Sequence, residues 1–121
     1  MYDFDNIDPV VSEFVDEYVD SFITWDLVLF FYENPFTMGT PSSIAMSIGR
    51  LDSDVLPYLE KLVEKKVLSR EEHVQDSAEA VYSYIPDKDF ERRVEQFQKA
   101  LKDRASRLMI VSKVLQKEAK K

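Results

Sequence analysis

The chain has 121 residues, 45% of them apolar, and no cysteine, which is sufficient for a packed core and excludes a disulfide framework or a thiolate metal site. Its formal net charge of −7 disfavours strong nonspecific attraction to nucleic-acid phosphates. No apolar run approaches the length of a membrane-spanning helix, and the first 20 residues carry seven acidic and no basic groups, so we expect a cytoplasmic protein with no membrane partner.

Charge is unevenly distributed along the chain. Residues 1–49 carry nine acidic and no basic groups, whereas residues 87–121 carry eleven basic and six acidic groups. All sixteen positive charges therefore lie from Arg50 onward. Because the two ends differ in sign, a dimer of such chains can still present a positive face despite its acidic total.

The first predicted element is an amphipathic helix between Ile7 and Phe22, where apolar residues recur at alternating steps of three and one. Asp8 followed by Pro9 is typical of a helix start. The apolar stripe includes Phe14 and Tyr18 and is broad. It therefore predicts packing against the C-terminal helix, a second subunit, or both.

A second helix is predicted over Trp25–Glu33, capped by Thr24 and ended by Asn34-Pro35. Its sequence is too apolar for a surface helix, so we expect it at the centre of the core. Its aromatic residues at helical spacing favour core packing over a ligand pocket. Residues 36–39 are expected to form a loop.

The stretch Thr40–Leu68 has the pattern of two short helices joined by a tight turn and followed by a strand. Thr40 precedes a proline and is a predicted N-cap, and Gly49 suits a left-handed turn at the end of the first short helix. Asp52 is the predicted N-cap of the next helix, and Pro57 is expected in or near its first turn. This order predicts a helix-turn-helix.

Two short strands are predicted next, over Val67–Val74 and Ala80–Ile85, and they form a hairpin directly after the third helix. The single histidine, His73, falls in the first of them. Its expected exposure favours a solvated side chain over a catalytic base. With only two glycines, the chain also lacks a glycine-rich phosphate loop. We expect no catalytic residues, no metal site and no cofactor.

A final helix is predicted over residues 88–117, because apolar residues recur there at alternating steps of four and three. At 1.5 Å per residue it would be roughly 45 Å long, which predicts that its stripe packs against a second subunit. The alternative is a helix that folds back on its own chain. The predicted homodimer interface comprises Phe14, Tyr18, Phe90, Val94, Phe97, Leu101, Leu108, Val111 and Leu115.

The segment Ile23–Asp87 resembles the prokaryotic winged-helix regulators of the MarR, ArsR and PadR groups. The residues that carry the resemblance are Ile44-Ala45, Ile48-Gly49, Val55, Leu59, Leu62, Val67-Leu68 and Tyr84-Ile85-Pro86. The resemblance implies a mainly α fold with a small β-hairpin. It divides the chain into an N-terminal helix (1–22), a winged-helix domain (23–87) and a C-terminal dimerisation helix (88–121).

The same resemblance implies a homodimeric, DNA-binding transcriptional regulator whose third helix, about residues 53–66, enters the major groove. Its implied DNA contacts are Arg50, Ser53, Tyr58, Lys61, Lys65 and Arg70. The third helix contains no arginine, however, and the wing tip at residues 75–79 has no basic residue. Lys66 stands where that family commonly has glycine. The alternative is a winged-helix protein-interaction module that has lost strong DNA binding.

Overall fold

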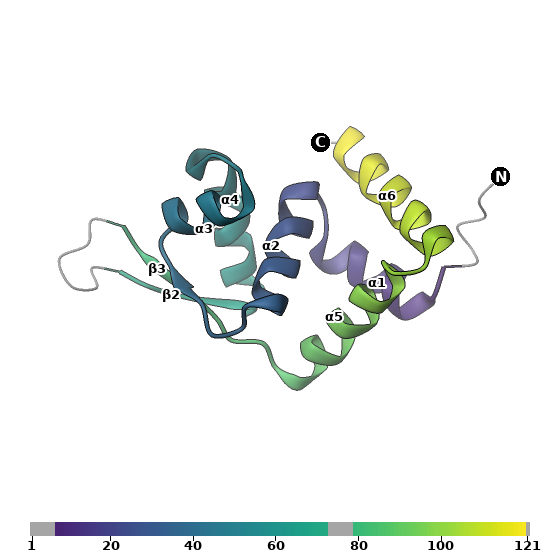
Figure 1. Cartoon of the computed structure of the whole chain (residues 1–121), viewed down its shortest axis with the longest axis horizontal. Helices are drawn as coiled ribbons and strands as arrows, with labels where there is room; N and C mark the ends of the chain where they lie inside the picture. The colour runs from purple at the N-terminus through teal and green to yellow at the C-terminus, as the bar shows by residue number, and fades with distance from the viewer. Residues whose placement is uncertain (1–6, 73–78, 121) are drawn as a thin grey trace. The chain divides into compact units, whose positions relative to one another are not determined.

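The structure is a computed structural model that describes residues 7–72 and 79–120. This part of the chain contains six helices and one antiparallel sheet of three strands in the order β1-β3-β2, which confirms the mainly α prediction (Figure 1). The elements are α1 (Pro9–Tyr18), α2 (Phe22–Glu33), β1 (Met38–Gly39), α3 (Pro41–Ile48), α4 (Asp52–Glu64), β2 (Leu68–Glu71), β3 (Val81–Tyr84), α5 (Lys88–Ala100) and α6 (Arg104–Ala119). His73 lies outside the described residues.

The chain divides into two compact units. One contains the described residues up to Trp25 together with those from Lys88 onward, and the other spans Asp26–Asp87. The first unit thus holds α1, α5 and α6, and the second holds α3, α4 and the sheet.

In the first unit, α1 packs against α5 and α6. The ring of Phe14 lies 5.5 Å from that of Phe90 and 5.2 Å from that of Phe97, measured between centroids. Asp8 caps α1 by accepting a hydrogen bond from the backbone N–H of Val10 at 2.9 Å, as its position before a proline predicts. Aromatic packing and a local cap therefore position this helix.

The boundary between the first two helices lies earlier in the sequence than predicted. α1 ends at Tyr18, and α2 begins at Phe22 instead of Trp25. The cause is Ser21, whose hydroxyl accepts the backbone N–H of Thr24 at 3.0 Å and so serves the first turn of α2. The prediction of Thr24 as the cap was wrong, because the hydroxyl of Ser21, three residues earlier, caps the helix instead.

The prediction of one long C-terminal helix was also wrong. α5 ends at Ala100, and Asp103 begins α6 by accepting the backbone N–H of Ser106 at 3.0 Å and its hydroxyl at 2.7 Å. The apolar repeat continues across this break, which is why periodicity alone did not reveal it. The signal that does reveal it is an Asp followed three residues later by a serine.

The residues predicted to form the dimer interface therefore differ from one another in burial. Phe14, Phe90, Val94 and Phe97 are buried within this chain, as the alternative of a helix folded back on its own chain implies. Tyr18, Leu101 and Val111 are half-buried, whereas Leu108 and Leu115 are exposed. A dimer interface at the exposed residues of this set remains a prediction.

In the second unit, the first short helix begins and ends where the sequence predicted. Thr40 caps α3 by accepting the backbone N–H of Ser43 at 3.2 Å, and Gly49 ends it with a left-handed φ of 70°. Asp52, however, is the first residue of α4, and Leu51 occupies the cap without a side-chain hydrogen bond. Pro57 therefore lies in the second turn of α4, deeper than expected.

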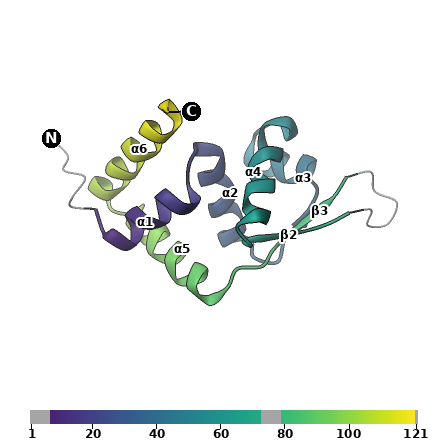
Figure 2. The ribbon, with the colours of Figure 1, turned by 180° about the vertical axis from the view of Figure 1, so that it is seen from behind.

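Strand β3 lies at the centre of the sheet, with β2 on one side and β1 on the other. Both views show β2 and β3 side by side (Figures 1 and 2). Both strands are shorter than predicted, and β1 falls within the segment predicted as a loop. Arg70 and Gly39 flank Tyr82 in the register. The starts of α3 and α4 lie close to β3, and the candidate site is found there.

Candidate functional site

The outward face of α4 presents the residues on which the DNA-binding prediction depends. Ser53, Pro57, Lys61 and Lys65 follow one another at steps of four and are exposed. Tyr58 is half-buried, and the Lys61 ammonium lies 5.4 Å from the centre of its ring, a cation–π contact. The structure thus brings Ser53, Tyr58 and Lys61 together on α4, and Lys65 follows directly as its C-cap.

Arg50, predicted to contact DNA from the turn, is bound to a carboxylate of its own unit. Its Nε and one terminal nitrogen lie 2.9 Å and 2.8 Å from Oδ2 of Asp26 on α2. A guanidinium held in this way has most of its charge compensated and is not available to phosphate without breaking the pair. The partners are 24 positions apart in the chain, which hid this pair from sequence reasoning.

Arg70, the predicted wing contact, is also engaged within the unit. It forms ion pairs with Glu60 of α4 and with Glu72, the latter at 3.1 Å. The charge of Glu60 is the main reason that the pKa of Arg70 is raised above its ordinary value. The guanidinium therefore joins β2 to α4 through these ion pairs, while the side chain itself is exposed.

Tyr82 completes this group. Its side chain is 1% exposed, and its hydroxyl donates a hydrogen bond to Oε2 of Glu60 at 2.8 Å. Burial, together with the neighbouring carboxylate, raises the pKa of Tyr82 to about 12. The neutral phenol is thus the stable form in the fold, and the contact between β3 and α4 depends on a Tyr82–Glu60–Arg70 group that sequence reasoning missed.

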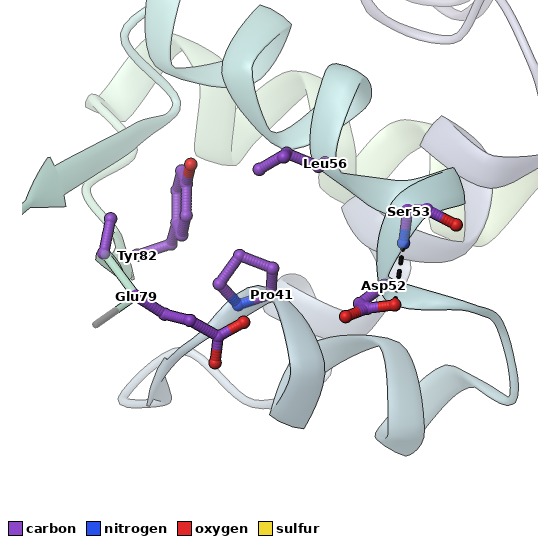
Figure 3. A pocket seen from close by; sticks show the side chains of 7 residues that line it. Pro41, Asp52, Ser53, Leu56, Glu79 and Tyr82 are labelled. Carbon is purple, nitrogen blue, oxygen red and sulfur yellow. Dashed lines mark hydrogen bonds between the residues drawn. The ribbon is translucent and has the colours of Figure 1, made fainter. Parts of the chain in front are cut away.

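A pocket of about 250 Å³ lies beside this group, where the starts of α3 and α4 meet β3. Pro41, Leu56, Ala80 and Tyr82 form its apolar wall, and Asp52, Ser53 and Glu79 complete its lining. Figure 3 shows the carboxylates of Glu79 and Asp52 on either side of Pro41. The pocket is small compared with sites for drug-sized ligands, which measure roughly 300–1,000 Å³.

The two carboxylates of the pocket converge on one hydroxyl. The Ser42 hydroxyl oxygen lies 2.8 Å from Oε1 of Glu79 and 3.4 Å from Oδ2 of Asp52. A serine has a single hydroxyl proton, so it satisfies one of these oxygens well and leaves the other with a weaker contact. The other oxygen of Asp52 accepts the backbone N–H of Ser53 at 2.9 Å. The pocket is therefore bordered by negative charge.

The whole of the second unit is acidic. Residues 26–87 contain eleven Asp and Glu against five Lys and Arg, a net charge of −6 with His73 neutral. DNA affinity depends on cations that replace the counterions of the phosphates. Both arginines among these five basic residues are held in ion pairs, so the face has weak electrostatic attraction for a nucleic acid.

Three cations of the basic C-terminal segment form ion pairs with the acidic first helix. In the first unit, Arg93 lies 2.8 Å from Glu17, and Lys113 and Lys117 each lie 3.2 Å from Asp16. Burial alone would raise the pKa of Asp16, but the two lysines outweigh it and lower the pKa. These three cations therefore stabilise the packing of α1 against its neighbours.

Comparisons with known proteins add no family to this picture: no protein-family model, no curated protein and no solved structure matches the chain. Within residues 7–72 and 79–120, no helix is long and apolar enough to cross a membrane. The same residues contain no group of three side chains arranged to hold a metal ion. The candidate site is thus defined by the pocket and by the exposed face of α3 and α4.

Proposed function

We propose that this chain is a protein-interaction module that uses a winged-helix arrangement, with the face made by α3, α4 and β3 as its contact surface. One observation carries the proposal. The face exposes large apolar side chains, and acidic residues outnumber basic ones in the unit that forms it. Met46 is 82% exposed, Leu51 68% and Leu56 43%. Exposed apolar residues that cluster beside polar ones are typical of surfaces that bind other proteins.

The ion pairs of the two arginines support the same function. A winged helix that binds DNA needs its turn and wing cations directed at phosphate. Here Asp26 holds Arg50, and Glu60 holds Arg70. Both arginines therefore strengthen the fold, and the contact surface keeps an acidic character that selects a partner with basic groups.

The test combines site-specific photo-crosslinking in the native cells with a direct DNA titration. A photoreactive amino acid replaces Met46 or Lys61 in separate variants, and Lys102 in the turn before α6 serves as the control position. The expected result is one protein captured from both α3–α4 positions and not from Lys102. The captured protein is then purified and titrated with the unmodified chain to verify direct binding.

A second candidate is the homodimeric DNA-binding regulator, and one observation favours it. Ser53, Lys61 and Lys65 lie along the exposed face of α4, the helix that would enter the major groove. Random 20-base-pair duplexes titrated at several salt concentrations distinguish the two candidates. Binding that weakens steeply with salt and is lost in Lys61→Glu would establish the regulator and refute the interaction module.

A further inference from the structure

We infer that the pocket between α3, α4 and β3 is a subsite for an arginine side chain presented by a basic segment of the partner protein. This inference rests on the proposed function and specifies the chemistry of the partner. It follows from the size of the pocket, its apolar wall and the convergence of its two carboxylates.

The size of the pocket indicates what kind of group it holds. A volume of about 250 Å³ is below the range of sites for cofactors and drug-sized ligands, and it suits a single long side chain. Three exposed residues of α4 line it, Asp52, Ser53 and Leu56. A partner segment that lies along this exposed side of α4 can therefore reach the pocket with one side chain.

The apolar wall selects a side chain with a hydrocarbon stem. Leu56 and the ring of Tyr82 contribute to this wall, with Pro41 beside the carboxylates (Figure 3). Lysine and arginine bury their methylene groups along such surfaces while the charged end stays with polar partners. A short polar side chain would leave the apolar wall uncovered.

The carboxylates select a cation and favour arginine over lysine. Asp52 and Glu79 both approach the Ser42 hydroxyl, so two negative charges lie within two hydrogen-bond lengths of each other. A guanidinium has five N–H donors in a planar fork and can bond to both carboxylates together. An ammonium group is a compact point charge that matches two separated acceptors less well. Binding of the guanidinium also relieves the repulsion between the two carboxylates.

The same carboxylates have a structural role that the experiment must separate from binding. Asp52 is the first residue of α4, and Glu79 contacts the second residue of α3, so each lies at a helix N-terminus where negative charge is favourable. Loss of either carboxylate therefore lowers stability somewhat, whether or not the pocket binds a ligand. Thermal unfolding of each variant measures that part independently.

The experiment uses the full chain labelled with ¹⁵N and three blocked amino acids as probes: N-acetyl-arginine methylamide, the lysine counterpart and the citrulline counterpart. Citrulline has the shape of arginine without its charge. We expect the arginine probe to shift the amide signals of residues 41–42, 52–56 and 79–82, the lysine probe to do so more weakly, and the citrulline probe to have no effect. Glu79→Gln and Asp52→Asn should each weaken arginine binding by about fivefold. Glu71→Gln, the same change of charge on β2 outside the pocket, should leave it unchanged.

Three results would overturn the inference: equal shifts with arginine and citrulline, shifts that spread over other acidic surfaces, or the same weakening in Glu71→Gln. Leu56→Ala shortens the apolar wall without a change of charge, and it should weaken arginine binding in a chain whose helix starts are intact. Failure of the arginine probe, with photo-crosslinks from Met46 and Lys61 still formed, removes this subsite and leaves the interaction function standing. Salt-sensitive binding to duplex DNA removes the function itself.

Discussion

Helices α3 and α4 end in the same way but with different residues, and this difference predicts opposite effects of substitution. After α3, the backbone N–H groups of Gly49 and Arg50 bond back to Met46 and Ala45. After α4, those of Lys66 and Val67 bond back to Val63 and Leu62. Both ends are Schellman motifs, which need one left-handed residue. Gly49 has φ 70° and Lys66 has φ 64°.

The magnitudes follow from the cost of the left-handed conformation, which is roughly 1–2 kcal/mol for a residue with a Cβ. A Cβ at Gly49 would meet no atom within 4 Å, so Gly49→Ala carries the backbone cost alone. It should destabilise the protein by about 1 kcal/mol. Lys66→Gly removes the same cost but increases the entropy of the unfolded chain, so we expect a gain of about 0.5–1 kcal/mol. A change of 1 kcal/mol corresponds to a shift of about 4 °C in the melting temperature.

The assay is urea unfolding followed by circular dichroism, with thermal unfolding as a second measurement. The transition midpoint should move in opposite directions for the two variants. The slope of the unfolding free energy against urea concentration should stay constant. Lys65→Gly is the matched control, because Lys65 has a right-handed φ of −86° and glycine there can only weaken the helix end. The reasoning is refuted if Lys66→Gly destabilises the protein as much as Lys65→Gly does.

Three further predictions concern the sheet, the Tyr82 hydroxyl and the start of α6. A Cβ at Gly39 would lie 2.8 Å from the Ser43 hydroxyl oxygen and 3.0 Å from Cγ1 of Ile44, so Gly39→Ala should cost about 1–3 kcal/mol in urea unfolding, and an unchanged midpoint would contradict the close packing of β1 on α3. The pKa of Tyr82 is raised from 10.0 to about 12, so the unfolded chain ionises first and stability is lost as pH rises from 10 to 12. The difference in unfolding free energy between the parent protein and Tyr82→Phe should therefore shrink by up to about 3 kcal/mol across that window, and a constant difference would count against the buried phenol. Asp103→Ala removes the cap of α6 and should lower the melting temperature, whereas Asp103→Asn should retain most of the stability; equal losses in both variants would show that the cap hydrogen bonds are unimportant.

Features that depend on neighbouring residues were predictable from the sequence. The starts of α1 and α3 at Asp8 and Thr40 and the left-handed end at Gly49 were predicted correctly, because a cap is formed by residues within a few positions of one another. The prediction for Asp52 missed by one residue, since Leu51 occupies the cap. Helix boundaries are defined only to within one or two residues, so a shift of this size is expected.

The break between α5 and α6 shows where a local pattern misled. The apolar residues keep a repeat of four and three through Leu101, and the repeat predicted a continuous helix. The competing signal at Asp103 and Ser106 was also local, but its hydrogen bonds outweigh a periodicity that two shorter helices satisfy equally well. Phe90 and Phe97 then pack against Phe14 of the same chain, which only the folded structure reveals.

The sequence by itself determined the mainly helical character, the helix ends at Asp8, Thr40 and Gly49 and the acidic character of the second unit, because these depend on composition and on contacts a few residues apart. Only the tertiary structure decided the chemistry of the candidate site. It placed Arg50 against Asp26, Arg70 and Tyr82 against Glu60, and Glu79 beside Ser42, 37 residues apart in the chain. An arginine in a sequence is a potential phosphate contact until its nearest carboxylate is known. The distance between each arginine and its nearest carboxylate is set by the packing of α2, α4 and the sheet, which no pattern of neighbouring residues encodes.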